Sequence, residues 1–180
     1  IARASIAREF GQPYNAAEDA DWLQQPAACF VTLTRHRQLR GCIGTLEAHR
    51  PLLKDVKSNA VAAAFHDPRF LPLTEPELKH TEIEISLLSA PQPLSFTDED
   101  EALLQIQPGI DGVIFEFSHY RSTFLPQVWE QLPATAEFMS HLKQKAGLPE
   151  DFWDEAVKLS RYSVNKWKES DFEQFEQQAV

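Results

Sequence analysis

LRGCIGTL, residues 39–46, is the stretch around which the rest of the chain is organised. Two glycines, Gly41 and Gly44, flank Cys42, Arg40 precedes them, and apolar residues close both ends. Glycine inside a strand lowers local stability, so it usually marks a bulge or a close approach by another group. The stretch therefore predicts both a part of the architecture and a candidate site.

The residues before this stretch predict a β-hairpin. Residues 29–34 are rich in β-branched and aromatic types, residues 35–38 have the character of a turn, and residues 39–46 return as the second strand. If Arg35 lies opposite Gln38, Cys42 lies opposite Val31 and shares a face with Cys29. A register that differs by one residue puts the two cysteines on opposite faces. We expect no disulfide between them.

The remaining elements are helices and short strands. We expect helices at 1–10, 51–65, 98–106 and 135–146, and strands at 82–88, 113–117, 122–125 and 157–164. The helix at 51–65 carries an apolar stripe, with Asp55 on its polar side. Thr74-Glu75-Pro76-Glu77 is a capping-box pattern. Gly147 is placed to end the helix expected at 135–146.

The composition limits the classes of partner. The chain has 180 residues and a formal net charge of −10, from 17 basic and 27 acidic residues. This charge opposes binding to nucleic acids and anionic membranes, although Arg35, Arg37 and Arg40 lie close together in the sequence. No apolar run approaches the roughly 20 residues of a membrane span. We expect a cytoplasmic protein that binds neither membrane nor nucleic acid.

The sequence lacks the common cofactor and metal signatures. It contains no Walker A, GxGxxG, HExxH, CxxC or GxSxG pattern. Its six histidines do not have the spacing of metal ligands on a common face. We therefore expect neither a metal nor another cofactor.

Cys42 is the candidate catalytic residue. A cation near a thiol favours the nucleophilic thiolate, and Arg40, two positions away on the same predicted strand, is expected on the same face. Gly41 and Gly44 would let a substrate backbone or a planar group come close. The alternative is that Cys42 is a small buried core residue, as free cysteines often are. No histidine is an obvious base for it.

Glu84, Asp67 and Arg69 are further candidates for the site. Glu84 lies on the polar side of the strand at 82–88, where it is a general base, an arginine partner or a solvent-facing carboxylate. Arg69 supplies a second cation in Asp67-Pro68-Arg69, which is alternatively a turn held by the Asp67 side chain. Pairing between Arg69 and Glu84 would serve structure alone.

These residues resemble a known family, the AMMECR domain family, whose microbial members are called AmmeMemoRadiSam system protein A. The segment Arg40-Gly41-Cys42-Ile43-Gly44 is similar to the family signature. Further similar segments follow in family order: Asn59-Ala60, Ala63-Ala64-Phe65, Asp67-Pro68-Arg69-Phe70, Glu84-Ile85-Ser86, Gly109-Ile110-Asp111-Gly112, Thr123 to Trp129, and Lys145-Ala146-Gly147-Leu148. The resemblance covers residues 1–168, which we take as one domain, followed by an acidic tail at 169–180.

The resemblance implies an α+β fold of two subdomains, each an antiparallel sheet with helices packed against it. It also implies association with a MEMO-like protein and a radical-SAM protein. The biochemical activity of the family is not established, and a catalytic role for its motif cysteine, carried onto Cys42, is a hypothesis.

Two functions are therefore in competition. In the first, Cys42 is the nucleophile or redox thiol of an enzyme, in a cleft between the subdomains, and Glu84 orients the arginines. A small anionic substrate would then contact Arg40, Gly41, Gly44, Asp67 and Arg69. In the second, the glycine-bracketed strand is a docking surface of an adaptor without catalytic activity. RNA binding is a third and weaker hypothesis, because it needs a basic surface.

Overall fold

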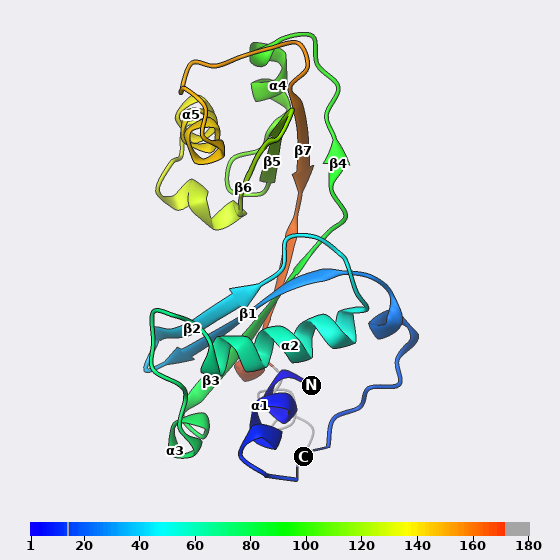
Figure 1. The fold of residues 1–180 in the computed structure, drawn as a ribbon, viewed down its shortest axis with the longest axis vertical. Helices are drawn as coiled ribbons and strands as arrows, with labels where there is room; N and C mark the ends of the chain where they lie inside the picture. Colours follow the sequence, from blue (N-terminus) through cyan, green and yellow to red (C-terminus); the bar gives the residue numbers. More distant parts are fainter. Residues whose placement is uncertain (14, 172–180) are drawn as a thin grey trace. The chain divides into compact units, whose positions relative to one another are not determined.

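The chain forms two compact units in the computed structural model, which describes residues 1–13 and 15–171 (Figure 1). Unit 1 comprises residues 1–88 and the chain from Asn165 onward, and unit 2 comprises Ser89–Val164. Each unit contains one four-stranded sheet. The predicted α+β class with two antiparallel sheets is confirmed. Unit 2 is thus an insertion between the last two strands of the sheet of unit 1.

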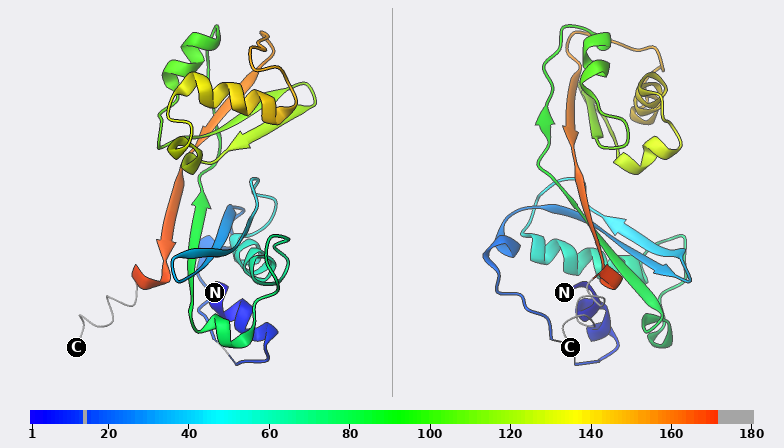
Figure 2. Two further views of the ribbon diagram at one scale, coloured as in Figure 1. Left: turned by 90° about the vertical axis from the view of Figure 1, so that its left-hand side faces the viewer. Right: turned by 180° about the vertical axis from the view of Figure 1, so that it is seen from behind.

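Unit 1 is a sheet with helices on one face. Its elements are α1 (Ala2–Glu9), the 3₁₀ helix η1 (Asp21–Gln24), β1 (Ala28–Arg35), β2 (Gln38–Gly44), α2 (Leu52–Phe65), α3 (Glu75–Leu78), β3 (Thr81–Leu88) and β8 (Val164–Lys168). The strand order is β2-β1-β3-β8, and β1 is antiparallel to both of its neighbours. Helices α1 and α2 contribute to the same hydrophobic core against this sheet (Figure 2).

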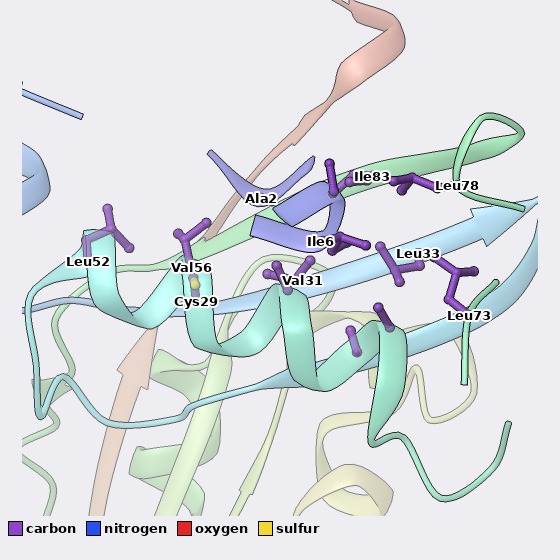
Figure 3. Close-up of a cluster of buried hydrophobic side chains, with 14 of the residues drawn as sticks. Ala2, Ile6, Cys29, Val31, Leu33, Leu52, Val56, Leu73, Leu78 and Ile83 are labelled. Atoms are coloured by element: carbon purple, nitrogen blue, oxygen red, sulfur yellow. The ribbon is translucent and has the colours of Figure 1, made fainter. Parts of the chain in front are cut away.

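The core of unit 1 lies between the sheet and these helices. Val31, Leu33 and Ile83 point from the strands toward Ile6 of α1 and Val56 of α2 (Figure 3). Because side chains alternate along a strand, the residues between them point to the other face. We call this second face the polar face of the sheet. It carries the half-buried side chains of Thr32, Thr34, Cys42, Glu82 and Glu84.

Unit 2 has its own core. Its elements are β4 (Gln92–Pro93), α4 (Glu99–Gln105), β5 (Gly112–Phe117), β6 (Tyr120–Phe124), the 3₁₀ helix η2 (Pro126–Glu130), α5 (Thr135–Ala146) and β7 (Lys158–Tyr162), with the strand order β4-β7-β5-β6. Phe115, Trp129 and Phe138 are buried together, and the rings of Trp129 and Phe138 stack with centroids 3.7 Å apart. Gly147 ends α5 in the left-handed conformation, as its position in the sequence predicts.

The hairpin register differs from the prediction after two residue pairs. Arg35 lies opposite Gln38 as expected, but the pairing shifts between Leu33 and Thr34, and Cys42 lies opposite Thr32. Arg40 is the extra residue of a β-bulge at this point. The bulge shifts the pairing by one residue, as a loop one residue longer would. The prediction that the two cysteines share a face is therefore wrong. Cys29 lies in the core, whereas Cys42 lies on the polar face. Because Arg40 is unpaired in the bulge, its spacing of two residues from Cys42 does not place the two side chains on one face.

Two further expectations need correction. Asp55 was expected on the polar side of its helix, but only 1% of its side chain is exposed, because buried donors surround its carboxylate. The strand expected at 157–164 is two strands, β7 and β8, separated by Ser163. The acidic tail begins at Glu169 with a residue that is bound by Arg3, and residues 172–180 lie outside the described residues.

Candidate functional site

Cys42 lies in a row of three polar side chains that crosses three strands. Thr32 of β1 is opposite Cys42 of β2 and also opposite Glu84 of β3. All three belong to the polar face and are half-buried. The two predicted catalytic residues, Cys42 and Glu84, thus lie on the same face of the sheet, on either side of Thr32. Their Cα atoms are roughly 10 Å apart, because they are two strand spacings from each other.

The sulfur of Cys42 has one hydrogen-bond partner among the described residues. The Thr32 hydroxyl donates to Cys42 Sγ at 3.4 Å. None of the described histidines is hydrogen-bonded to this sulfur, so the structure presents no Cys–His pair. Sequence reasoning missed Thr32, because only the register of the sheet reveals which residue lies beside Cys42.

The segment Asp67-Pro68-Arg69 holds the backbone of Cys42 at the edge of the sheet. The N–H of Cys42 donates to Asp67 Oδ2 at 2.9 Å, and Arg69 Nη2 donates to the carbonyl of Cys42 at 3.3 Å. Strand β2 is an edge strand, and these two bonds provide partners for the N–H and the C=O of Cys42, which have no neighbouring strand on that side. The segment is therefore a turn held by the Asp67 side chain, and it also places the Arg69 guanidinium at the carbonyl of Cys42.

Asp67 and Arg69 form a tight ion pair with a large difference in exposure. Arg69 donates from Nε to Asp67 Oδ1 at 2.9 Å and from Nη2 to Oδ2 at 2.7 Å, and its backbone N–H caps the same carboxylate. The Arg69 guanidinium, together with the Cys42 N–H, holds the pKa of the Asp67 carboxyl well below its usual range. The Asp67 side chain is 2% exposed, whereas that of Arg69 is 53% exposed. The guanidinium is therefore fixed at one side and accessible at the other.

The pKa of Arg69 is raised above its usual value, chiefly by the hydrogen bond to Asp67, with a smaller electrostatic contribution from Cys42. The direct contact between Arg69 and Cys42 is the hydrogen bond from Arg69 Nη2 to the carbonyl of Cys42. Arg69 does not pair with Glu84, which was the structural alternative.

Arg40 is engaged in a second ion pair. Its Nε and Nη2 donate to the carboxylate of Glu77 at 3.4 and 3.3 Å, and Nη2 also reaches the carbonyl of Pro72. The guanidinium carbons of Arg40 and Arg69 lie 5.9 and 5.5 Å from the centroid of the Phe70 ring. Only 15% of the Arg40 side chain is exposed, so Arg69 is the more accessible of the two predicted cations.

The two glycines of the motif are approached by protein groups. A Cβ atom on Gly41 would lie 2.1 Å from the carbonyl oxygen of Ala63, which shows how closely α2 packs on β2. A Cβ atom on Gly44 would lie 2.3 Å from the ring of Phe30. The space expected for a ligand at these two positions is thus occupied, in the Cβ direction, by helix backbone and by an aromatic ring.

Glu84 lies between two lysines of β8. Its carboxylate oxygens are each 3.8 Å from one ammonium group, Oε1 from Lys166 and Oε2 from Lys168. The lysine side chains are 47% and 52% exposed, and that of Glu84 is 18% exposed. Sequence reasoning did not select these lysines, because the expected strand ended before them.

A second polar cluster surrounds Cys29 in the core. The carboxylate of Asp55 accepts hydrogen bonds from the N–H of Cys29 at 2.9 Å, from the Thr45 hydroxyl at 2.6 Å and from Asn59 at 3.0 Å, and it pairs with Arg50. The Cys29 thiol also donates to it at 3.2 Å. Burial, reinforced by the charge of Asp55, raises the pKa of Cys29 to about 12. Because the thiol is buried and its pKa is raised, we expect Cys29 to be unreactive at neutral pH.

Comparisons with known proteins identify the family. A model of the AMMECR1 family matches residues 1–167. The chain belongs to the AMMECR1 family. Among related proteins, MJ0810 of Methanocaldococcus jannaschii is 38% identical over 149 residues, which are 78% of this chain and 72% of that protein. NEQ441 of Nanoarchaeum equitans is 36% identical over 163 residues, which are 83% and 88% of the two proteins.

A solved structure has the same fold. The crystal structure of the uncharacterized protein PH0010 from Pyrococcus horikoshii has a TM-score of 0.76 and 31% sequence identity, and the alignment covers 93% of this AMMECR1-family chain and 87% of that one. The names of these relatives state no activity.

Metal sites and membrane-spanning helices are both absent from the described part of this AMMECR1-family chain. Within residues 1–13 and 15–171, no group of three or more His, Cys, Asp or Glu side chains has the geometry of a metal site. Within the same residues, no helix is both long and apolar enough to cross a bilayer. What remains is an accessible guanidinium, a half-buried thiol and a hydroxyl within one small region.

Proposed function

We propose that this AMMECR1-family chain is a cysteine-dependent enzyme that acts on a small anionic substrate, with Cys42 as the reacting thiol and Arg69 as the anion-binding group. The observation that carries the proposal is the way in which Asp67 joins the two. One carboxylate binds the N–H of Cys42 and the guanidinium of Arg69, so the thiol and the cation keep a fixed relation.

Arg69 is suited to bind an anion. Its Nε and Nη2 are used by Asp67 and by Cys42, and Nη1 has no hydrogen-bond partner among the described residues. Because Asp67 already uses the Nε and Nη2 fork, the donors left for a carboxylate or phosphate group are the two N–H groups of Nη1. The guanidinium of Arg40 also lies over the Phe70 ring, and its charge is balanced by Glu77.

Anion selectivity at Cys42 tests the proposal. Iodoacetate and iodoacetamide alkylate thiols by the same reaction, but only iodoacetate is charged. We expect Arg69→Gln to lower the ratio of the iodoacetate rate to the iodoacetamide rate at Cys42 by about fivefold, since a nearby cation contributes about 1 kcal/mol in a mostly hydrated site. Arg69→Lys should keep most of the ratio, and Lys54→Gln, which removes an exposed charge from α2, should leave it unchanged.

Two outcomes would contradict the proposal. One is a folded protein in which Cys42 does not react with either reagent. The other is a rate ratio that is the same in the wild type and in Arg69→Gln. The site of modification is read by mass spectrometry of peptides, so reaction at Cys29 is distinguished.

An adaptor function is the second candidate, and a specific observation favours it. Leu71 follows Phe70 and is 83% exposed, and Leu39 of β2 is 43% exposed. A partner protein could bury these apolar side chains together with the charged segment beside them. The partners would be the MEMO-like protein and the radical-SAM protein that the family resemblance implies.

Binding to a purified MEMO-like protein separates the two functions. An adaptor should keep its affinity in Cys42→Ala and lose about tenfold or more in Leu71→Asp, because a charge cannot be buried in an apolar contact without large cost. Exposed Leu104 of unit 2 offers the matched control, Leu104→Asp. Unchanged affinity in Leu71→Asp would remove this docking surface.

A further inference from the structure

Thr32 occupies the centre of the polar row. It is on β1, the strand between β2 and β3, and its Cα partners are Cys42 on one side and Glu84 on the other. Directly opposite residues on one face of antiparallel strands have Cβ atoms about 4.5–5.5 Å apart. The Thr32 side chain is therefore a neighbour of both predicted catalytic residues.

The single proton of the Thr32 hydroxyl is directed at the sulfur. A hydroxyl group can donate one hydrogen bond and accept two. Thr32 Oγ1 is 3.4 Å from Cys42 Sγ in donor geometry. The oxygens of Glu84 face the ammonium groups of Lys166 and Lys168 instead. These two lysines therefore balance the charge of Glu84 and leave the Thr32 proton to Cys42.

We propose that Thr32 is a positioning residue for the chemistry of Cys42, whose hydroxyl orients the sulfur and stabilises it as an anion. The inference rests on the proposed function, because it gives the thiol of that site its activating partner. A hydrogen bond to an ionised acceptor is roughly twice as strong as one to a neutral acceptor. The hydroxyl therefore favours the thiolate over the thiol, in place of the histidine that other thiol enzymes use.

Thr34 provides the matched control. It is on the same strand and the same face, two residues further along, and it lies opposite Leu39 and Glu82. It is half-buried like Thr32, but none of the described sulfur atoms is its hydrogen-bond partner. Substitution by valine removes the hydroxyl at either position, keeps the β-branched shape and suits a strand.

The test is the rate of alkylation of Cys42 by iodoacetamide at pH 7 and pH 10, followed by mass spectrometry. We expect Thr32→Val to react about fivefold more slowly at pH 7 and at an unchanged or slightly higher rate at pH 10, because the lost bond stabilises only the anion. Thr32→Ser keeps the hydroxyl and should stay within about twofold of the wild type, as should Thr34→Val.

Each other result overturns the inference. Equal slowing of Thr32→Val at both pH values would mean that Thr32 acts by packing, and faster reaction at both would mean that it only shields the sulfur. A Thr32→Val rate equal to that of the wild type at pH 7, in a protein whose Cys42 reacts and depends on Arg69, would overturn this inference alone. A wild-type Cys42 that reacts at neither pH would overturn the proposed function as well.

Discussion

Gly41 allows helix α2 to pack closely on strand β2. The carbonyl oxygen of Ala63 occupies the space where a side chain would begin, at 2.1 Å from an ideal Cβ atom. The obstacle is helix backbone, which cannot rotate aside. A methyl group here must push α2 away from β2, and the shift would also move Cys42, the next residue.

We predict that Gly41→Ala lowers the free energy of unfolding by about 2 kcal/mol or more, because overpacking against backbone forces a shift of the helix. Chemical denaturation monitored by circular dichroism measures this loss. Gly109→Ala is the control, since Gly109 has open space around it but a positive φ of 79°, and there we expect about 1 kcal/mol. A smaller loss for Gly41→Ala than for Gly109→Ala would show that the helix yields easily.

The two cysteines should differ strongly in reactivity. Cys29 has no exposed surface, and burial raises its pKa to about 12 from 9.0. Because the folded-state pKa is the higher one, Cys29 stabilises the fold below pH 9 and loses this contribution as the pH rises through 12.

We predict that at neutral pH alkylation of the folded protein labels Cys42 and spares Cys29, and that both are labelled in denaturant. Peptide mass spectrometry after a timed pulse of reagent gives the two rates. Labelling of Cys29 at the rate of Cys42 in the absence of denaturant would mean that the core around Asp55 opens frequently.

At the scale of elements, helix α3 depends on a charged cap. Glu77 closes the capping box with Thr74 and also pairs with Arg40 and Arg35. Hydrogen bonds from Thr74, and then the Arg40 guanidinium, lower the pKa of Glu77 from 4.5 to about 2. Since the folded-state pKa is the lower one, the stabilisation is present above pH 4.5 and disappears as the pH falls through 2.

We predict that Glu77→Gln costs about 1–2 kcal/mol at pH 7, after allowance for partial exposure, and that the wild type and the variant converge in stability between pH 4.5 and 2. Glutamine can still close the capping box, so the difference reports on the charge. Denaturation midpoints across this pH range give the curve. Glu75→Gln on the same helix should lower the stability less than Glu77→Gln does. Equal losses would mean that the ion pairs of Glu77 do not stabilise the fold.

The hairpin shows what sequence patterns can and cannot predict. The two strands, the turn and the first residue pairs follow from residue type, because β-branched runs separated by a short turn favour a hairpin. The bulge at Arg40 does not follow, because one unpaired residue leaves no periodic signal in a short strand. The shift moved Cys42 to the polar face, and Thr32 and the lysines of β8 became neighbours of the site only through the actual register.

The same limit applies to buried charge. The apolar stripe of α2 predicts Asp55 on the polar side of the helix, and an isolated carboxylate is costly to bury. In the structure it is buried because Cys29, Thr45 and Asn59 supply donors from three different segments. By contrast, the turn at Asp67 held by its own side chain could be predicted, because the carboxylate and the N–H of Arg69 are only two residues apart.

At the scale of the whole molecule, the two cores are independent. Every residue of the unit 2 core lies within Ser89–Val164, whereas the sheet of unit 1 needs β8, which follows unit 2 in the chain. Glu169, just after β8, forms a bidentate ion pair with Arg3 of α1 and accepts a hydrogen bond from the N–H of Ile83.

We predict that residues 89–164 expressed alone fold cooperatively, and that residues 1–88 expressed alone self-associate, because β3 then becomes an unprotected edge strand. Thermal unfolding by circular dichroism tests the first fragment, and sedimentation tests the second. Joining residues 1–88 to 164–180 through a short Gly-rich linker restores β8 and should restore a monomer. A monomeric, stable 1–88 fragment would contradict the need for β8.

The insertion also sets the order in which the protein can mature on the ribosome. The strands of the hairpin and β3 are synthesised before all of unit 2, and β8 arrives only after Val164. At ordinary rates of translation this leaves one flank of β3 without a neighbour for about 4–15 s. Nascent chains therefore pass through an interval in which unit 2 is free to fold while the sheet that carries Cys42 waits for its last strand.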